Sequence, residues 1–225
     1  PQPPQGPEAP VVVGDAWSNG PIDRFVLARL PSDEIAPSPL ADPRTRLRRL
    51  SFLLTGLPPA PEEVDAFREN PSPARYAAEV ERLLASPHFG ERWARMWLDL
   101  ARYADETPHY LNSAEEAWLY RDWVIRAFNA DRPFDDFVRQ QLAADQQTDS
   151  DPADLAALGF LGLSPTYWKE LRLAPDVIKT VVADEWDERI DAVTRTFLGL
   201  TVSCARCHHH KFDPVTVQDY YALAG

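Results

Sequence analysis

The residues best suited to chemistry lie near the end of the sequence, in the run Cys204-Ala205-Arg206-Cys207-His208, which holds both cysteines of the chain. Two thiols three positions apart can reach the two vinyl groups on one edge of a porphyrin, and the adjacent histidine can then ligate the iron. This C-x-x-C-H spacing is typical of covalent haem attachment. It predicts one haem c bound through Cys204 and Cys207, with His208 as the proximal iron ligand.

Two other kinds of site use the same residue types. Zinc could take Cys204, Cys207 and two of the consecutive histidines that start at His208. All of its ligands would then fall in one short segment, whereas zinc fingers draw their ligand pairs from separated segments. A redox-active disulfide between the two cysteines is typical of a βαβ context, of which the sequence gives no sign. Either alternative would make the chain a haem-free zinc-binding or structural module.

Charged and histidine side chains around the motif are candidates for contacts with the haem. Arg206 and Lys211 can offset the negative charge of the propionates. His210 is too close in sequence to reach the far face of the same haem, so we expect it to hydrogen-bond locally, to a propionate or a nearby carboxylate. Asp213 precedes Pro214, which predicts a turn, and the Asp213 carboxylate is placed to orient a neighbouring histidine.

The distal iron ligand has two candidates. Cytochromes that only carry electrons usually close this side of the haem with Met or His. Met96, the only methionine, lies on an apolar helical stripe, where core filling is the competing interpretation. His109 lies in a polar stretch further along the chain. If neither binds, a five-coordinate iron would be open to small ligands, which favours a haem-dependent oxidoreductase acting with a downstream domain.

The elements that must position these residues read as helices. Apolar residues recur at helical spacing in two long segments, 89–103 and 175–200, and strand-like alternation is scarce. Proline recurs where a helix would begin, and it suits the first turn because its missing N–H would have no partner there. These predicted starts are Pro21, Pro61, Pro73, Pro87 and Pro152.

The predicted fold is therefore all-α. We expect a single domain over residues 15–225, with about nine or ten helices and the haem-attachment motif near its C-terminal end. Residues 1–14 are rich in proline and read as an extended linker in front of this domain.

The net charge of −12 limits the partners. It disfavours nucleic acid, because phosphate binding requires a basic surface, and it suits docking to a basic redox partner. No apolar run reaches the roughly 18 residues of a membrane span, so we expect no transmembrane segment. The sequence shows neither an initiator methionine nor a signal peptide, so we expect a mature or excised fragment of a longer protein.

Several phrases resemble the planctomycete-type cytochrome c family, exported proteins with a domain of unknown function that carries this haem motif. The phrases are residues 21–25, 48–52, 54–58, 91–95, 97–105, 120–125, 197–202, 204–208 and 210–214. They span nearly the whole chain after residue 20. The sequence departs from the family pattern at His209, where Asp is common, and at Met96, where His is frequent, so the resemblance implies no general distal role for Met at position 96.

The resemblance implies an exported protein with one covalent haem c, located in the periplasm or another compartment outside the cytoplasm. It also implies a second domain downstream and, in many members, a further cytochrome module upstream. We therefore expect a mono-haem c-type cytochrome domain that exchanges electrons with a partner protein or a fused module. Whether the full protein is an enzyme stays open at this point.

Overall fold

The computed structural model describes residues 3, 5–30, 35–104, 116–148, 151–163 and 173–225, and every regular element in these ranges is a helix. The predicted all-α class and the single domain are therefore confirmed. His109 lies outside the described residues. No helix in these ranges combines the length and the apolarity that crossing a bilayer requires.

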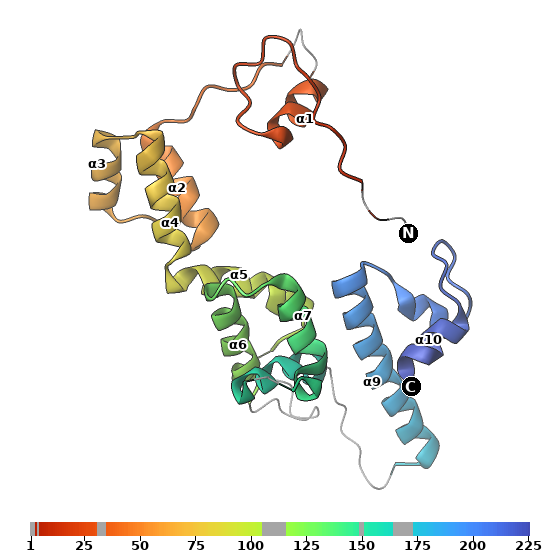
Figure 1. Cartoon of the computed structure of the whole chain (residues 1–225). Helices are drawn as coiled ribbons and strands as arrows, with labels where there is room; N and C mark the ends of the chain where they lie inside the picture. Colours follow the sequence, from red (N-terminus) through yellow and green to blue (C-terminus); the bar gives the residue numbers. More distant parts are fainter. Residues whose placement is uncertain (1–2, 4, 31–34, 105–115, 149–150, 164–172) are drawn as a thin grey trace.

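Ten α-helices, three 3-10 helices and one π-helix follow one another in the described ranges (Figure 1). The elements are α1 (Pro21–Arg29), α2 (Pro43–Leu54), α3 (Pro61–Glu69), α4 (Pro73–Leu84), α5 (Pro87–Leu100), α6 (Ala117–Asn129), α7 (Phe134–Ala143), the 3-10 helices η1 (Ala144–Gln146) and η2 (Pro152–Leu158), α8 (Gly159–Gly162), α9 (Pro175–Val193), the π-helix η3 (Thr194–Leu198), the 3-10 helix η4 (Val202–Arg206) and α10 (Val217–Ala224).

Proline marks the helix starts as predicted. Pro21, Pro61, Pro73 and Pro87 are each the first residue of an α-helix. Pro152 differs, because it begins a 3-10 helix rather than an α-helix. The rule works because the first N–H groups of a helix have no partner within it, so that proline loses nothing there.

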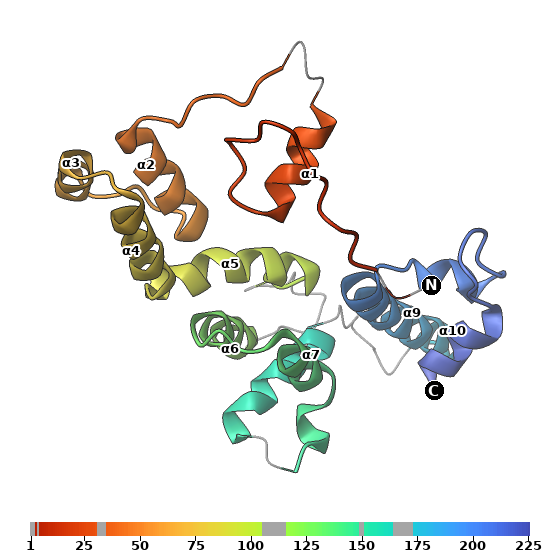
Figure 2. The ribbon, with the colours of Figure 1, turned by 45° about the horizontal axis from the view of Figure 1, so that its top comes forward.

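The helices form three groups along the chain. α2 packs on α3 and α4 at one end, and α5 pairs with α6 in the middle, where α7, η2 and α8 join them. At the other end α9 packs with η4 and α10, and these helices lie together in the turned view of Figure 2. α1 carries no buried residue and lies at the periphery in Figure 1.

The middle group holds the main core. Its buried aromatic side chains include Tyr120, Trp123 and Phe160, each at most 2% exposed. Gly90 lets α5 approach α6 closely, because a Cβ at this position would lie 2.5 Å from the backbone oxygen of Ile125. The contact between the two helices therefore depends on the missing side chain.

A buried polar network crosses this core. The hydroxyl of Tyr120 and the indole N–H of Trp97 both donate to Oε1 of Gln141 over 2.7 Å. The Gln141 amide in turn donates to the backbone oxygen of Phe137 over 3.0 Å. Burial raises the pKa of Tyr120 well above its usual value, so its hydroxyl stays protonated and remains a donor.

The apolar stripe predicted for residues 175–200 is only partly buried. The α-helix ends at Val193 and continues as the π-helix η3. Trp186 is 45% exposed, whereas Ala192 and Phe197 contact the middle core. This segment therefore joins the C-terminal group of helices to the rest of the molecule.

Candidate functional site

The motif segment forms the 3-10 helix η4, and its three residues per turn divide the side chains among three faces. Positions three apart in such a helix point the same way. The inner face is made by Val202 and Ala205 and a second face by Ser203 and Arg206. The outer face carries Cys204, and Cys207, the residue directly after η4, follows it three positions on.

The inner face fixes η4 to the protein. Val202 is 2% exposed and Ala205 is fully buried, and both belong to a small apolar cluster with Ile190 of α9 and Tyr220 of α10. Burial of these two side chains sets the rotation of the helix about its axis. The outer face must then point away from α9 and α10.

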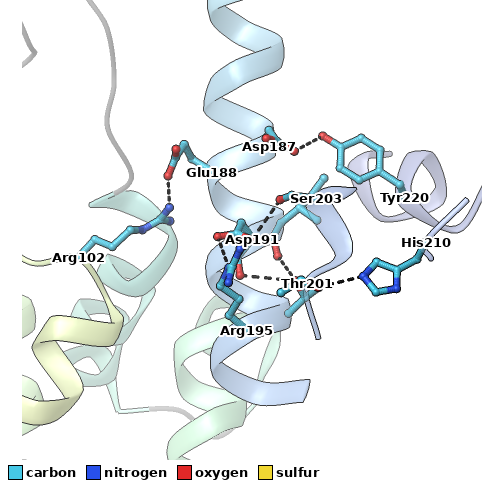
Figure 3. A network of polar contacts seen from close by, with 11 residues as sticks. Arg102, Asp187, Glu188, Asp191, Arg195, Thr201, Ser203, His210 and Tyr220 are labelled. Carbon is cyan, nitrogen blue, oxygen red and sulfur yellow. Dashed lines mark hydrogen bonds and ion pairs between the residues drawn. The ribbon is translucent and has the colours of Figure 1, made fainter. Parts of the chain in front are cut away.

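The second face of η4 docks on a row of carboxylates. Asp184, Asp187 and Asp191 share one side of α9, because their spacings follow the helical repeat. Nη2 of Arg206 lies 2.9 Å from Oδ1 of Asp184, and Nη1 lies 3.6 Å from Oδ2 of Asp187. The Ser203 hydroxyl donates to Asp191 over 3.1 Å (Figure 3). The hydrogen bond to Asp184 is the main reason that the pKa of Arg206 rises further above its ordinary value.

Tyr220 adds α10 to the same anchor. Its hydroxyl donates to Oδ1 of Asp187 over 2.7 Å (Figure 3), and the residue is only 3% exposed. Burial and then the Asp187 carboxylate raise the pKa of Tyr220, so the hydroxyl remains a proton donor. Asp187 therefore binds both η4 and α10 to α9.

The outer face presents Cys204 and Cys207, and both are exposed. His208 follows directly and is also exposed. The three residues that the sequence predicts for haem attachment are therefore all exposed, with Cys204 in η4 and Cys207 and His208 directly after it.

The hydrogen bond of His208 fixes its tautomer. Nδ1 of His208 lies 2.8 Å from the backbone oxygen of His209. A carbonyl oxygen only accepts, so Nδ1 of His208 is the donor in this bond, and Nε2 is the ring nitrogen that the bond leaves unused. Metal-binding histidines are commonly oriented by such a bond from the other ring nitrogen.

In His209 and His210, by contrast, Nδ1 accepts a hydrogen bond. The backbone N–H of Val217, at the start of α10, donates to Nδ1 of His209 over 3.2 Å. The backbone N–H of Asp213 donates to Nδ1 of His210 over 2.8 Å. Nε2 of His210 is then the protonated nitrogen, 3.0 Å from the Thr201 hydroxyl (Figure 3). His210 therefore bonds within its own loop through both ring nitrogens.

The two basic residues predicted to contact the haem lie on different sides. Arg206 faces α9 and is held by its carboxylates, so it serves to dock η4. Lys211 is exposed, and its Nζ lies 5.0 Å from the ring centroid of Phe212, which is itself 82% exposed. Of the two, Lys211 is the one whose charge is not engaged by α9.

The structure does not bring Met96 to this segment. Met96 is 47% exposed on α5, and α5 packs on α6 and α2, whereas η4 packs on α9 and α10. The other predicted distal ligand, His109, lies outside the described residues.

In the part of the chain that the structure describes, no group of three or more His, Cys, Asp or Glu side chains is arranged to hold a metal ion. The two cysteines and the histidines beside them are therefore not arranged as a four-ligand zinc site. Both ring nitrogens of His210 already have partners, which removes one of the zinc ligands considered from the sequence.

A family model described as PSCyt2, a protein of unknown function (DUF1549), matches residues 21–225. The chain belongs to this family. The PSCyt2 match begins at the first residue of α1 and includes η4, α9 and α10. No curated protein and no solved structure matches the chain. The family description names no ligand, so an interpretation of the PSCyt2 motif rests on the residues described above.

The carboxylates that hold the motif segment on α9 were not predicted from the sequence. Asp184, Asp187 and Asp191 stand at a helical spacing on one face, and this spacing is a signal that a row of carboxylates shares a side. Their partners, Arg206 and Ser203 of η4, depend on the packing of η4 against α9, which the sequence does not indicate. Gly199, whose φ of +66° lies in the left-handed region, ends the π-helix before the motif.

Arg102 connects the C-terminal group of helices to the middle core. It follows α5 with a φ of +56°, and its guanidinium pairs with Glu188 of α9 (Figure 3). α9 therefore carries carboxylates for both neighbours, with Glu188 for the core and Asp187 for the motif segment.

Proposed function

We propose that this chain is a mono-haem c-type cytochrome domain, with one haem c attached through Cys204 and Cys207 and ligated by Nε2 of His208. The observation that carries the proposal is the set of hydrogen bonds around the motif. Among the three consecutive histidines, His208 is the one whose Nδ1 donates to a backbone carbonyl, which leaves Nε2 as the ligand atom.

The residues around the motif would serve the haem in distinct ways. Cys204 and Cys207 supply the two thioether links, and their shared face allows both to reach one edge of a flat ring. The carbonyl of His209 holds the imidazole of His208 in one orientation and makes its Nε2 a stronger donor to the metal. When bound, haem supplies a one-electron couple whose potential depends on axial ligands and burial.

The anchoring to α9 suits an electron carrier. The two carboxylates at Arg206 and the bond from Tyr220 hold the segment that bears the sulfurs, so the ligand geometry is set before the cofactor is attached. The surplus of acidic residues favours encounter with a basic redox partner, or with a fused module of that charge.

The same proposal places the protein outside the cytoplasm, in the periplasm or an equivalent compartment, because c-type haem is attached there. The donor and acceptor are then a partner protein or another module of a longer chain. His109 and Met96 are the distal-ligand candidates from the sequence, and separate substitution tests them, although Met96 lies on α5, which does not pack on η4.

The decisive experiment is to produce the 225-residue chain in a host that matures c-type cytochromes, with an export signal added. We expect the denatured protein to exceed its polypeptide mass by one haem, and sharp absorption bands in the reduced state. Met96→Ala and His109→Ala are then compared by ferric spectra. A denatured mass equal to that of the polypeptide would overturn the proposal.

A matched pair of variants tests the role of His208. His208→Ala removes the free Nε2, whereas His209→Ala removes a ring whose Nδ1 accepts from Val217. We expect His208→Ala to lose the six-coordinate or histidine-ligated spectrum, and His209→Ala to keep it. Equal spectra for the two variants would show that the hydrogen bonds do not select the ligand.

A further inference from the structure

A cavity of about 350 Å³ lies on the middle group of helices, away from the motif segment. It is formed by α5, the end of α6 and the start of α7, and its size falls within the range of small-ligand pockets, about 300–1,000 Å³. Most of its wall is aromatic. The aromatic residues are Phe89, Trp97, Phe128, Phe134 and Phe137.

One carboxylate at this cavity stands in an unusual backbone position. Asp131, which lines the cavity, has a φ of +48° and occupies the position after the end of α6 that glycine usually fills. The N–H of Asp131 donates to Phe128 over 3.1 Å, and the N–H of Arg132 donates to Ala127 over 3.1 Å, which completes the helix end. Glycine would adopt this backbone conformation with less strain, whereas Asp131 also places a carboxylate at the cavity.

The charges around the cavity leave Asp131 uncommitted. Within the described residues no side chain pairs with its carboxylate, whereas the neighbouring Asp136 and the buried Asp154 both pair with Arg132. The guanidinium of Arg132 also lies 5.5 Å from the ring centroid of Trp123. Asp131 and Arg132 are thus the charged residues that line the cavity, and the ion pairs of Arg132 with Asp136 and Asp154 offset its charge.

We propose that this cavity binds a small organic cation, an amine with an aromatic or similarly apolar body. The apolar body would fill the aromatic cavity, and the ammonium group would lie at Asp131. Aromatic walls attract a cation through their ring electrons. The Asp131 carboxylate adds a negative charge that no ion pair within the described residues offsets, since Arg132, which also lines the cavity, pairs with Asp136 and Asp154. This inference does not depend on the haem, because neither the motif segment nor α9 lines the cavity.

The test uses a matched pair of probes on the full chain. 2-Phenylethylamine carries the ammonium group, and 2-phenylethanol has a similar shape without a charge. Titration calorimetry should show tighter binding of the amine to the unaltered protein. In Asp131→Asn, which keeps the shape of the side chain, amine binding should weaken by about threefold to tenfold while alcohol binding stays the same.

Asp135→Asn is the control, since Asp135 pairs with Arg139 and does not line the cavity. It removes the same charge nearby and should leave amine binding unchanged. The proposal is overturned if both variants weaken the amine equally, if the alcohol binds as tightly as the amine, or if neither probe binds.

A second variant separates strain from binding. Asp131→Gly fits the left-handed backbone without a Cβ, so its thermal unfolding midpoint should equal or exceed that of the unaltered protein, while amine binding falls as in Asp131→Asn. A clear drop in the midpoint would mean that Asp131 stabilises the fold by itself, and it would overturn the assignment of Asp131 to a ligand.

Discussion

The middle core and the C-terminal group of helices hold their chemically capable side chains in opposite ways. In the core, Trp97 and Tyr120 both donate hydrogen bonds to Gln141, and Tyr120 and Gln141 are buried. In the C-terminal group, polar contacts face inward on α9, and the sulfurs of Cys204 and Cys207 are left exposed. Polar side chains therefore hydrogen-bond to one another inside the core, whereas at α9 they hold the segment whose cysteines are exposed.

The difference follows from what each region can bury. The five helices α5, α6, α7, η2 and α8 meet in the core, so aromatic rings find neighbours on several sides, and apolar burial carries the stability. η4 is a short helix with only Val202 and Ala205 on its inner face. Such a small apolar contact needs the ion pairs and hydrogen bonds of α9 to hold one orientation. The comparison predicts large effects from core substitutions and small, local effects near the motif.

The largest effect is expected from Phe160→Ala in the core. Phe160 is fully buried, and its ring centroid lies 4.9 Å from that of Phe197, which leads into the motif segment. Removing the ring should lower the free energy of unfolding by about 3–5 kcal/mol through the lost burial and the cavity left behind. Urea denaturation measures the loss, and a change under 1 kcal/mol or so would contradict this account of the core.

A smaller loss is expected from Gly90→Ala, which adds a methyl group where α5 meets α6. The new Cβ would lie 2.5 Å from the Ile125 oxygen and 2.7 Å from the Asn129 side chain, so the helices must separate. We expect a loss of about 1–3 kcal/mol in urea denaturation.

Gly162→Ala is the matched control for that change. No atom lies within 4 Å of the Cβ position at Gly162, so alanine there should be neutral or stabilising by up to about 1 kcal/mol. Equal losses for the two variants would show that close approach is not what Gly90 provides.

Asp187→Ala tests the C-terminal group and should cost about 1–2 kcal/mol, because it leaves the buried Tyr220 hydroxyl without its acceptor. Asp184→Ala removes a half-exposed partner of Arg206 and should cost less than about 1 kcal/mol. Hydrogen exchange should show the loss of protection in η4 and α10 and not in α5 or α6. The reverse order of the two losses would argue against Asp187 as the central anchor.

The smallest effect is a loosening of α10 in acid. The backbone N–H and then the hydroxyl of Thr216 donate to the Asp219 carboxylate and hold its pKa below the usual range. A lowered pKa in the folded state means that the stabilisation is complete above about pH 4 and is lost as the pH falls through the lower, folded value. NMR signals of α10 should follow this titration, and Asp219→Asn should abolish it.

The sequence predicted the fold class and most helix starts because both depend on local chemistry. Pro61 and Pro87 begin helices for a reason that needs no tertiary contact. The stripe through Trp186 was predicted less well, because Trp186 is 45% exposed although it lies on the apolar side of α9. The spacing of apolar residues indicates which side of a helix is apolar, but not how much of that side the neighbouring helices cover.

The sequence by itself determined the order of helices, the acidic charge and the pair of cysteines beside a histidine. Only the tertiary structure decided how the motif is presented, since burial of Val202 and Ala205 turns the sulfurs outward. It also distinguished three histidines that look alike in sequence. The hydrogen-bond partners of His208 and His210 are set by the folded backbone and by Thr201, so the fold selects which nitrogen of each ring donates.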